Sequence, residues 1–406
     1  MNKYISRSIE SVLKKAAAEF PAVVLTGPRQ SGKTTVLKHV FSDSYQYVSV
    51  EPPDIRIAAS EDPRGFLAMY PPPLIIDEIQ NVPELLPYIK EIIDNNRSRT
   101  GQYLLTGSQN LLLVEKVTES LAGRAAMLHL FPLSRRETEN LPQKPFPWES
   151  LNKESIKEKK SLHDIWASFL RGGYPELNVN LERDISLWHA SYVQTYLERD
   201  IRGLRQIGDL SQFQSFIRAL AARSAQLVNF SDIARDLGIA VNTVKSWLSL
   251  LEATFQVIVL RPYHVNIGKR LVKSPKVYFS DVGTLCYLTG LRDPEHAASG
   301  PMGGKIMETA VLSEIVRTLT HRGIDPQIYF WRTSTGKEVD FIVESEGRLI
   351  PIEVKKTSTP RPAMAKSIKT FLNDFGDQTS GGYVVNLGDL RLPLGSNVTS
   401  LPFIEL

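Results

Sequence analysis

The sequence is poor in cysteine and contains no long apolar run. Its single cysteine, Cys286, cannot form a disulfide within the chain, which argues against the disulfide-stapled secreted class and suits a reducing compartment. No segment approaches the roughly 20 consecutive apolar residues that a membrane span needs, and the first ten residues lack the apolar core of a signal peptide. From these absences we expect a cytoplasmic protein that has no membrane partner.

The remaining composition is that of a globular protein. Hydrophobic residues make up 42% and charged residues 23% of the 406 residues, and a chain of this length is expected to form two or three domains. The net charge is only +4, but residues 201–276 carry eleven Lys and Arg against four Asp and Glu. Such a basic segment is typical of a surface that binds DNA phosphates, although a solvated helix face gives the same count.

A phosphate-binding motif follows the first apolar run, in AVVLTGPRQSGKTT. It has the P-loop pattern Gly-x-x-x-x-Gly-Lys-Thr between an expected strand and an expected helix. Backbone N–H groups of such a loop wrap the β-phosphate of ATP; the lysine reaches the β- and γ-phosphates, and the threonine hydroxyl binds Mg²⁺. The predicted nucleotide-binding residues are Gly27, Pro28, Arg29, Gln30, Ser31, Gly32, Lys33, Thr34 and Thr35.

Two acidic residues end the next apolar run, PPPLIIDEIQ. Asp77 is predicted to hold Mg²⁺ through water, and Glu78 to polarise the water that attacks the γ-phosphate. A third apolar run ends at Ser108. Because ligands gather at the carboxyl ends of parallel strands, we expect Ser108 beside the γ-phosphate.

The middle of the chain changes character twice. Residues 135–161 are polar, proline-punctuated and poor in aliphatic residues, which predicts an excursion or a linker. Farther on, Asp232 marks the first turn of one helix and Gly238 the turn after it, and a second helix is expected from about Asn242, followed by a strand at 255–260. This order predicts a winged helix, which is either a DNA reader or a rigid lid.

Two short apolar runs near the C-terminus, EVDFIVES and RLIPIEVKK, read as strands. The alternating apolar side chains from Val339 to Val343 are expected on one face, so that Asp340 lies on the other. Gly347 between the runs favours a tight hairpin, which would bring Asp340 near Glu353. Two such carboxylates repel unless a cation such as Mg²⁺ lies between them; a surface hairpin with a solvated charged face is the alternative.

The order helix, Asp340, then Glu353-Val354-Lys355 resembles the PD-(D/E)XK nuclease fold over about residues 300–406. The resemblance implies that Asp340 and Glu353 bind a metal and that Lys355 is the catalytic lysine. It also implies that Glu308, on a preceding helix, completes the metal site. Pro351 is unusual within this pattern, because a proline lacks a ladder donor and belongs at a sheet edge.

Six segments follow one another in the order LTGPRQSGKTT, LIIDEIQNVP, LLTGSQN, ESLAGRAAMLHLFPLSRRE, RGGYPE and YLERDI. In this order they resemble a large bacterial and archaeal group of AAA+ ATPases with a C-terminal domain of unknown function. The resemblance implies a sensor-1 role for Ser108. It makes Arg124 a candidate arginine at the γ-phosphate, with Arg171 at a helical lid as a second candidate.

The expected fold class is α/β. Residues 1–140 are predicted to form an AAA+ core, a parallel sheet with helices on both faces; 141–200 a linker and helical lid; 201–275 a winged-helix-like domain; and 276–406 a nuclease-like α/β domain. The predicted function is Mg²⁺- and ATP-dependent action on or near DNA, with a metal-dependent nuclease site. The alternative is an ATP-gated regulatory or toxin-antitoxin-like switch whose C-terminal domain binds a partner without cutting. The oligomeric state and any protein partner stay open in both hypotheses.

Overall fold

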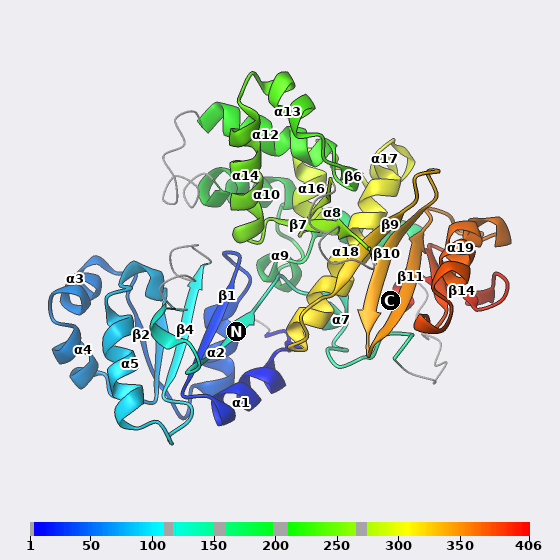
Figure 1. Ribbon diagram of the computed structural model, residues 1–406. Coiled ribbons are helices and arrows are strands. Elements are labelled where there is room, and N and C mark those ends of the chain that lie inside the picture. Colours follow the sequence, from blue (N-terminus) through cyan, green and yellow to red (C-terminus); the bar gives the residue numbers. More distant parts are fainter. Residues whose placement is uncertain (1–3, 109–116, 118, 150–159, 198–209, 265–273) are drawn as a thin grey trace.

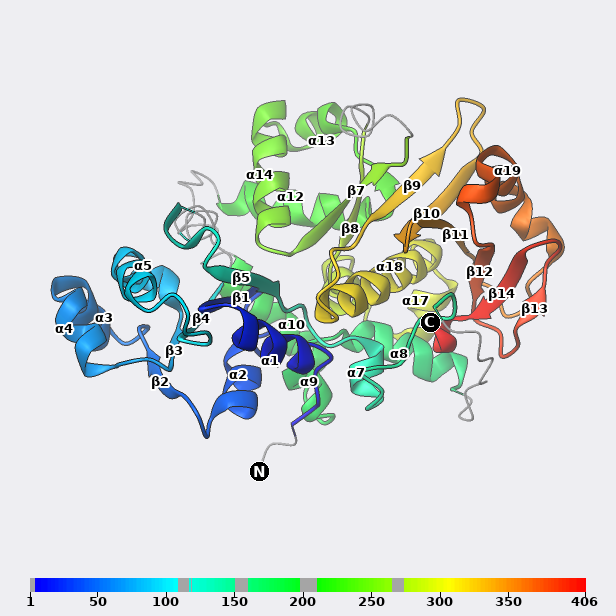
Figure 2. The same cartoon turned by 60° about the horizontal axis from the view of Figure 1, so that its bottom comes forward.

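Two sheets organise the molecule, one near each end of the chain. The computed structural model describes residues 4–108, 117, 119–149, 160–197, 210–264 and 274–406. Figure 1 shows a smaller sheet in the N-terminal part, a larger sheet in the C-terminal part and a group of helices above them. Figure 2 turns the same view and separates the two sheets more clearly.

The N-terminal sheet has the strand order β2-β3-β4-β1-β5, and all neighbouring strands are parallel. Its elements are α1 (Glu10–Glu19), β1 (Ala22–Gly27), α2 (Lys33–Phe41), β2 (Gln46–Ser49), α3 (Pro53–Glu61), α4 (Pro63–Met69), β3 (Leu74–Asp77), η1 (Ile79–Asn81), α5 (Leu85–Asn95), β4 (Tyr103–Ser108) and β5 (Ala125–His129). Side chains of β1 alternate between two cores. Val23 and Leu25 pack with α1 and α2, whereas Ala22 and Val24 pack with α4 and α5. Helices therefore cover both faces, and the predicted α/β fold is confirmed.

The middle of the chain is mostly helical. Its elements are α7 (Arg135–Thr138), α8 (Leu162–Arg171), α9 (Pro175–Val179), α10 (Ile185–Tyr192), η2 (Val193–Leu197), α12 (Leu210–Ala222), β6 (Gln226–Leu227), α13 (Phe230–Leu237), α14 (Val241–Ala253), β7 (Val257–Pro262), β8 (Lys276–Phe279), α16 (Val282–Leu288) and α17 (Pro294–Ser299). Asn229 caps α13 through the N–H groups of Ser231 and Asp232, and Gly238 ends it in the left-handed conformation. The two expected helices, the turn and the strand are thus present.

Residues 135–149 differ from the predicted linker. Arg136 and Phe146 are buried, with 1% and 0% of their surface exposed, and Arg322 forms an ion pair of 2.8 Å with Glu149. Arg135, Glu137 and Glu139 also form ion pairs within the protein, so the polarity of the segment did not mark exposure. Of the predicted linker, residues 150–159 lie outside the described part of the chain.

The second sheet has nine strands in the order β13-β14-β12-β11-β10-β9-β7-β8-β6. The C-terminal elements are α18 (Gly303–His321), β9 (Ile328–Arg332), β10 (Glu338–Ser345), β11 (Arg348–Val354), η3 (Pro362–Ala365), α19 (Lys366–Phe375), η4 (Gly376–Gln378), β12 (Gly382–Asn386), β13 (Leu392–Pro393), β14 (Val398–Pro402) and η5 (Phe403–Glu405). Strand β7 pairs with β8 on one side and, through Arg261 and Pro262, with β9 on the other. The predicted domain boundary at residue 275 therefore falls between two paired strands of one continuous sheet.

The predicted hairpin joins β10 and β11. Ser345 pairs with Arg348, and the two residues between them, Glu346 and Gly347, have φ values of 50° and 73°. Positive φ at both positions is the requirement of a tight two-residue hairpin turn. The antiparallel pairing predicted from Gly347 is confirmed.

The faces of β10 differ from the expected alternation. A register shift between Val339 and Ile342 places Val339 in a different core from Phe341, since an extra residue at a bulge exchanges the two faces. The prediction that Val339 shares a face with Phe341 was wrong. Pro351 lies in the interior strand β11, facing Gly382 of β12; a Cβ at Gly382 would meet the Pro351 Cγ at 3.1 Å.

Candidate functional site

The P-loop connects β1 and α2 through residues 28–32, as the sequence predicts. A Cβ at Gly27 would lie 2.2 Å from the carbonyl oxygen of Leu130, and Gly32 has a φ of 94°. Both positions therefore exclude a larger residue. Pro28 and Ser31 are buried, Arg29 is half-buried, and Gln30 and Thr35 are exposed.

The Lys33 ammonium lies inside this loop. Its Nζ donates to the carbonyl oxygens of Gly27 and Pro28, both at 3.0 Å, and the residue is 6% exposed. These bonds hold the positive charge at the mouth of the loop, where the oxygens of a bound phosphate can replace the two carbonyl groups.

Asp77 ends β3 next to the start of α2. Its Oδ1 accepts a hydrogen bond of 2.8 Å from the Thr34 hydroxyl, and its Oδ2 accepts one of 2.9 Å from Tyr47. Thr106 of β4 also donates to Oδ1. The Thr34 hydroxyl and the Asp77 carboxylate are therefore in direct contact, and these two oxygen ligands would hold an Mg²⁺ ion at this site.

Glu78 follows in the left-handed conformation, with φ 60° and ψ 44°. Its N–H donates to the Thr106 hydroxyl at 3.2 Å, and its carboxylate accepts from the Gln80 side chain. Ser108 is paired with Gly27 across β4 and β1, so its backbone lies beside the P-loop; its side chain is outside the described part. The structure thus brings the predicted P-loop, Asp77, Glu78 and the backbone of Ser108 together at the carboxyl ends of β1, β3 and β4.

Arg124 does not belong to this group. It precedes β5 at the opposite end of β1, where its carbonyl accepts from Ala22, about 17 Å from Gly27 along the strand. Its guanidinium forms two hydrogen bonds with Asp94, at 2.7 and 2.9 Å. Arg124 therefore cannot contact a nucleotide in the P-loop of its own chain. Arg171, the second candidate, donates to the carbonyl oxygens of Leu177 and Leu181.

The predicted C-terminal carboxylates come together from three elements. Glu308 lies on α18, Asp340 on β10 and Glu353 on β11. Asp340 and Glu353 directly adjoin the paired residues Phe341 and Ile352. Burial and the charge of Asp340 raise the pKa of Glu308 to about 7 and that of Glu353 to about 8. Burial also raises the pKa of Asp340. The three carboxylates thus repel one another electrostatically, and a bound cation would offset this repulsion.

Two cationic side chains lie at this cluster. Lys355 follows β11, and its Nζ is 2.6 Å from Glu353. Lys276 of β8 was not predicted; it lies 3.3 Å from Glu308 and 2.5 Å from Glu338. Sequence reasoning counted Lys276 with the basic middle, because nothing local to β8 indicates that it pairs into the C-terminal sheet.

The donor set fits a metal held by two of the three carboxylates. One oxygen of Glu353, Oε2, is buried without a hydrogen-bond partner, and Asp340 accepts from the Val354 N–H at 2.8 Å. Glu308 is already bound by the Tyr278 hydroxyl at 2.5 Å and by Lys276. Within the described residues, no three acidic, histidine or cysteine side chains converge as metal ligands. The predicted direct role of Glu308 at a metal is therefore less well supported than those of Asp340 and Glu353.

In the basic segment 201–276, fewer Lys and Arg side chains are free of ion pairs and exposed than the number of basic residues in the sequence suggests. Arg223, Arg235 and Arg261 form ion pairs with Asp236, Asp232 and Glu252. Lys276 is buried at the carboxylate cluster, whereas Arg218 and Lys245 are exposed. The other counted basic residues, Arg202, Arg205, Lys269, Arg270 and Lys273, lie outside the described part of the chain.

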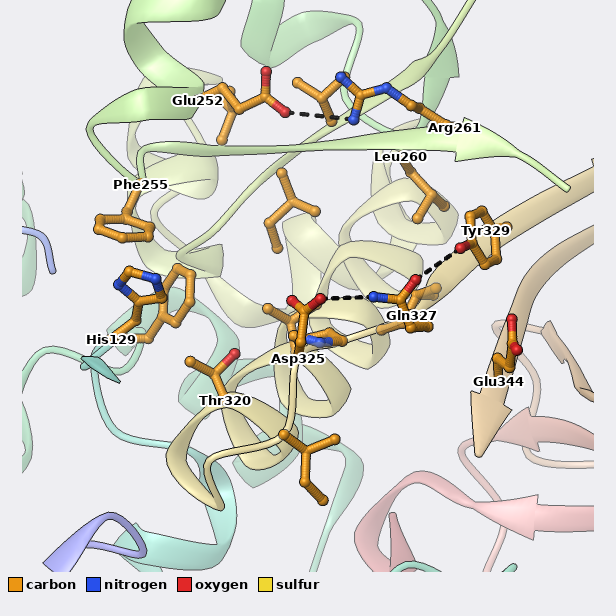
Figure 3. A pocket seen from close by; sticks show the side chains of 18 of the residues that line it. His129, Glu252, Phe255, Leu260, Arg261, Thr320, Asp325, Gln327, Tyr329 and Glu344 are labelled. Carbon is orange, nitrogen blue, oxygen red and sulfur yellow. Dashed lines mark hydrogen bonds and ion pairs between the residues drawn. The ribbon is translucent and has the colours of Figure 1, made fainter. Parts of the chain in front are cut away.

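A cavity of about 970 Å³ lies between β5, β7 and the C-terminal end of α18. Figure 3 shows His129 facing Phe255 at one side and the ion pair of Glu252 and Arg261 above them. The His129 Nδ1 is 2.7 Å from the hydroxyl of Thr26, which directly precedes the P-loop. None of the predicted site residues lines this cavity, so it is separate from both sites above.

Three family models match successive parts of the chain. An AAA domain covers residues 19–139, a domain of unknown function (DUF8612) covers 162–295, and another (DUF4143) covers 303–405. The uncharacterized proteins Rv2008c of Mycobacterium tuberculosis and Mb2031c of Mycobacterium bovis are each 30% identical to this chain over 400 residues, which is 98% of this chain and 83% of theirs. The chain belongs to the same family as these two proteins.

The N-terminal part is thus an AAA-type P-loop ATPase domain. Among solved structures, the Walker-type ATPase PABY2304 of Pyrococcus abyssi matches with a TM-score of 0.43 and 15% identity, over 70% of this chain and 96% of that one. No helix in the described ranges has the length and apolar character to cross a membrane.

Proposed function

We propose that this protein is an Mg²⁺-dependent ATPase that acts on DNA and carries a metal-dependent nuclease site in its C-terminal domain. The observation that carries the proposal is the coexistence of two sites in one chain. A P-loop lies beside Asp77 and Glu78 at the carboxyl end of the N-terminal strands, and a carboxylate cluster that includes the buried Glu353 lies beside Lys355.

In the ATPase site, the P-loop and Lys33 hold the phosphates, while Thr34 and Asp77 hold Mg²⁺. The ion, when bound, neutralises charge on the β- and γ-phosphates. Glu78 is the base that orients and deprotonates water, and Ser108 contacts the γ-phosphate in this proposal. Neither Arg124 nor Arg171 serves the nucleotide of its own chain in this proposal, because other groups occupy both guanidiniums.

Replacement of Glu78 by glutamine should separate binding from hydrolysis. Glu78→Gln keeps the side-chain shape and the phosphate cradle but loses the proton acceptor, so we expect kcat to fall at least about a hundredfold with ATP affinity retained. Steady-state ATPase rates and calorimetric ATP titration measure the two quantities. Glu84→Gln, an exposed acid in the connection that follows β3, is the matched control. A Glu78→Gln enzyme as fast as this control would assign the base elsewhere.

In the C-terminal site, Asp340 and Glu353 hold the metal and Lys355 orients the attacking water or the scissile phosphate. The metal, when bound, supplies an activated water and neutralises the phosphate. The unpartnered Oε2 of Glu353 supports this assignment, because a buried carboxylate oxygen without a donor is costly unless a cation binds it.

Plasmid cleavage tests this proposal. The full chain is incubated with supercoiled plasmid in Mg²⁺, with and without ATP, and again in EDTA. We expect nicked plasmid in Mg²⁺ and intact plasmid in EDTA. Glu353→Gln should remove the nicking and leave ATP hydrolysis unchanged, so a nicking activity that survives in this variant would be a contaminant and would count against the site.

A specific observation favours a second function, a switch that binds DNA or a partner without cutting it. Lys276 places an ammonium between Glu308 and Glu338, and a cation supplied by the chain can replace a metal in such a cluster. This alternative predicts ATP hydrolysis, no nicking under any metal condition, and no heat on adding Mn²⁺ to nucleotide-free protein.

The proposed DNA contact predicts a salt effect. Lys245 is exposed on α14, so Lys245→Ala should reduce the slope of log affinity against log salt by about 0.9, the contribution of one neutralised phosphate. Lys14→Ala, an exposed lysine on α1, is the control. Binding of duplex DNA measured by fluorescence anisotropy from 50 to 300 mM salt, a range of about sixfold, gives the slope. Equal slopes for the two variants would make the helical middle a lid rather than a DNA reader.

A further inference from the structure

Arg7 is a buried arginine outside every motif described above. It precedes α1, is 4% exposed, and holds three groups from separate parts of the chain. Its Nη1 donates to the carbonyl oxygen of Ser31 and its Nη2 to that of Phe131, both at 2.8 Å. Its Nε lies 3.2 Å from a carboxylate oxygen of Glu137. One guanidinium thus contacts the P-loop, the segment after β5, and α7.

The contact with Ser31 bears directly on the phosphate cradle. A trans peptide group is planar, and its C=O and N–H point in opposite directions. Because Arg7 binds the Ser31 carbonyl, the N–H of Gly32 in the same peptide group points away from the Arg7 guanidinium. Gly32 belongs to the P-loop, whose N–H groups are the ones that bind phosphate. Arg7 therefore fixes the orientation of one of the N–H groups that wrap the β-phosphate.

Glu137 extends the contact to the C-terminal part of the chain. It is fully buried and accepts from the N–H groups of Ser8 and Ser134, at 2.8 and 2.9 Å. Its Oε1 lies 3.2 Å from Nδ1 of His321, which is also fully buried. The His321 Nε2 accepts from the Phe131 N–H at 3.1 Å, so the neutral ring carries its proton on Nδ1, facing Glu137.

His321 is the last residue of α18, the helix that carries Glu308. The two residues are about 20 Å apart along the helix axis, and α18 contacts both β5 and β11. Figure 1 shows α18 passing from the side of the N-terminal sheet to the sheet of β10 and β11. A displacement at His321 can therefore move the helix that bears one member of the carboxylate cluster.

A second chain of contacts joins the same two parts. Arg317 of α18 donates to the Leu133 carbonyl and to Asp281, both at 2.9 Å. Asp281 in turn accepts from the Gly173 N–H at 2.8 Å. Two residues later, Pro175 lies beside the P-loop, with its Cγ 3.7 Å from a Cβ built at Gly32.

We propose that Arg7 is a positioning residue of the nucleotide site and that the Arg7–Glu137–His321 contacts transmit the state of the P-loop to α18. The proposal rests on the proposed use of ATP. It adds a route by which the effect of ATP binding is transmitted to the C-terminal carboxylate cluster. When phosphate binds and the loop tightens, the Ser31 peptide group pulls on Arg7, and Glu137 passes the change to the end of α18.

ATP affinity tests the first half. Arg7→Lys keeps the charge but cannot bind Ser31, Phe131 and Glu137 together, so we expect the Kd for ATP to rise about tenfold, the effect of losing one charged hydrogen bond. The matched control is Arg136→Lys. Arg136 is equally buried and pairs with Glu314 of α18, but it does not contact the P-loop; its Kd should stay within about twofold of the wild type.

Equal ATP affinities for the two variants would make Arg7 a structural residue only. Arg7→Gln, which is neutral, is the second variant, and loss of folding in both Arg7 variants would overturn the assignment in the same way. Failure of the wild type to bind ATP would instead overturn the proposed function, because it removes the ligand and not the contact.

Hydrogen exchange tests the second half. In wild type, ATP with Mg²⁺ should slow exchange of the backbone amides in the last turn of α18. His321→Gln should lose this ATP-dependent protection while its Kd for ATP stays within about twofold of wild type, because His321 does not touch the loop. Equal ATP-dependent protection in wild type and His321→Gln, or no protection in wild type, would show that α18 does not sense the nucleotide.

Discussion

Lys33→Ala is expected to remove nearly all of the stabilisation that ATP gives the protein. A ligand at a hundredfold above its Kd stabilises the folded state by about 2.7 kcal/mol. Lys33 carries the buried ammonium inside the P-loop, and alanine leaves the β- and γ-phosphates without it. Thermal unfolding with and without ATP and Mg²⁺ measures the effect, and the same variant should hydrolyse no ATP.

Lys38→Ala is the control for this experiment. Lys38 lies on the same helix and is exposed, with its ammonium 3.5 Å from the centre of the Tyr47 ring. Its removal changes the charge of α2 equally but leaves the loop intact, so the ATP-induced shift should match that of the wild type. Equal shifts in Lys33→Ala and wild type would mean that ATP binds elsewhere.

Features that depend on neighbouring residues were predictable from the sequence. The P-loop lies between β1 and α2 because its glycines, lysine and threonine are consecutive, and Asp77 follows because it ends a buried strand. The hairpin of β10 and β11 was predictable in the same way, since the positive φ of Gly347 is a local requirement.

Features that depend on contacts between distant segments were not predictable. The motif around Arg124 suggested a γ-phosphate contact, but its position at the start of β5 and its pair with Asp94 are set by the sheet order. Lys276 read as part of a basic surface, and its burial beside Glu308 follows from the pairing of β8 into the second sheet. The buried Arg136 belongs to a segment whose polarity predicted a linker.

The bulge in β10 is the clearest case in which the structure departs from the alternating pattern of apolar residues in the sequence. An alternating strand would place Val339 with Phe341, and one extra residue between Val339 and Ile342 reverses that assignment. Bulges are common beside functional groups, where they redirect a side chain. Here the bulge includes Asp340, the residue at the centre of the carboxylate cluster.

Asp340→Asn should abolish metal binding and plasmid cleavage without lowering the stability of the metal-free protein. The asparagine oxygen can still accept from the Val354 N–H, but the negative charge that raises the pKa of Glu308 and Glu353 is gone. Less repulsion means an unchanged or higher unfolding temperature in EDTA. Mn²⁺ titration by calorimetry should be done on full-length Lys33→Ala protein without nucleotide, so that the ATPase site contributes no heat.

Glu344→Gln is the matched control, because Glu344 is an exposed acid on the same strand. It removes one negative charge from β10 at a distance from the cluster, and both metal binding and cleavage should survive.

The decisive comparison for Asp340→Asn is between the stability of the protein and its cleavage activity. A metal site predicts that Asp340→Asn loses activity while gaining or keeping stability, since the carboxylates are held together for the cation. A cluster that serves only to bind Lys276 predicts the reverse: no Mn²⁺ heat in the parent protein, and lower stability in the variant because the buried ammonium of Lys276 loses a nearby negative charge.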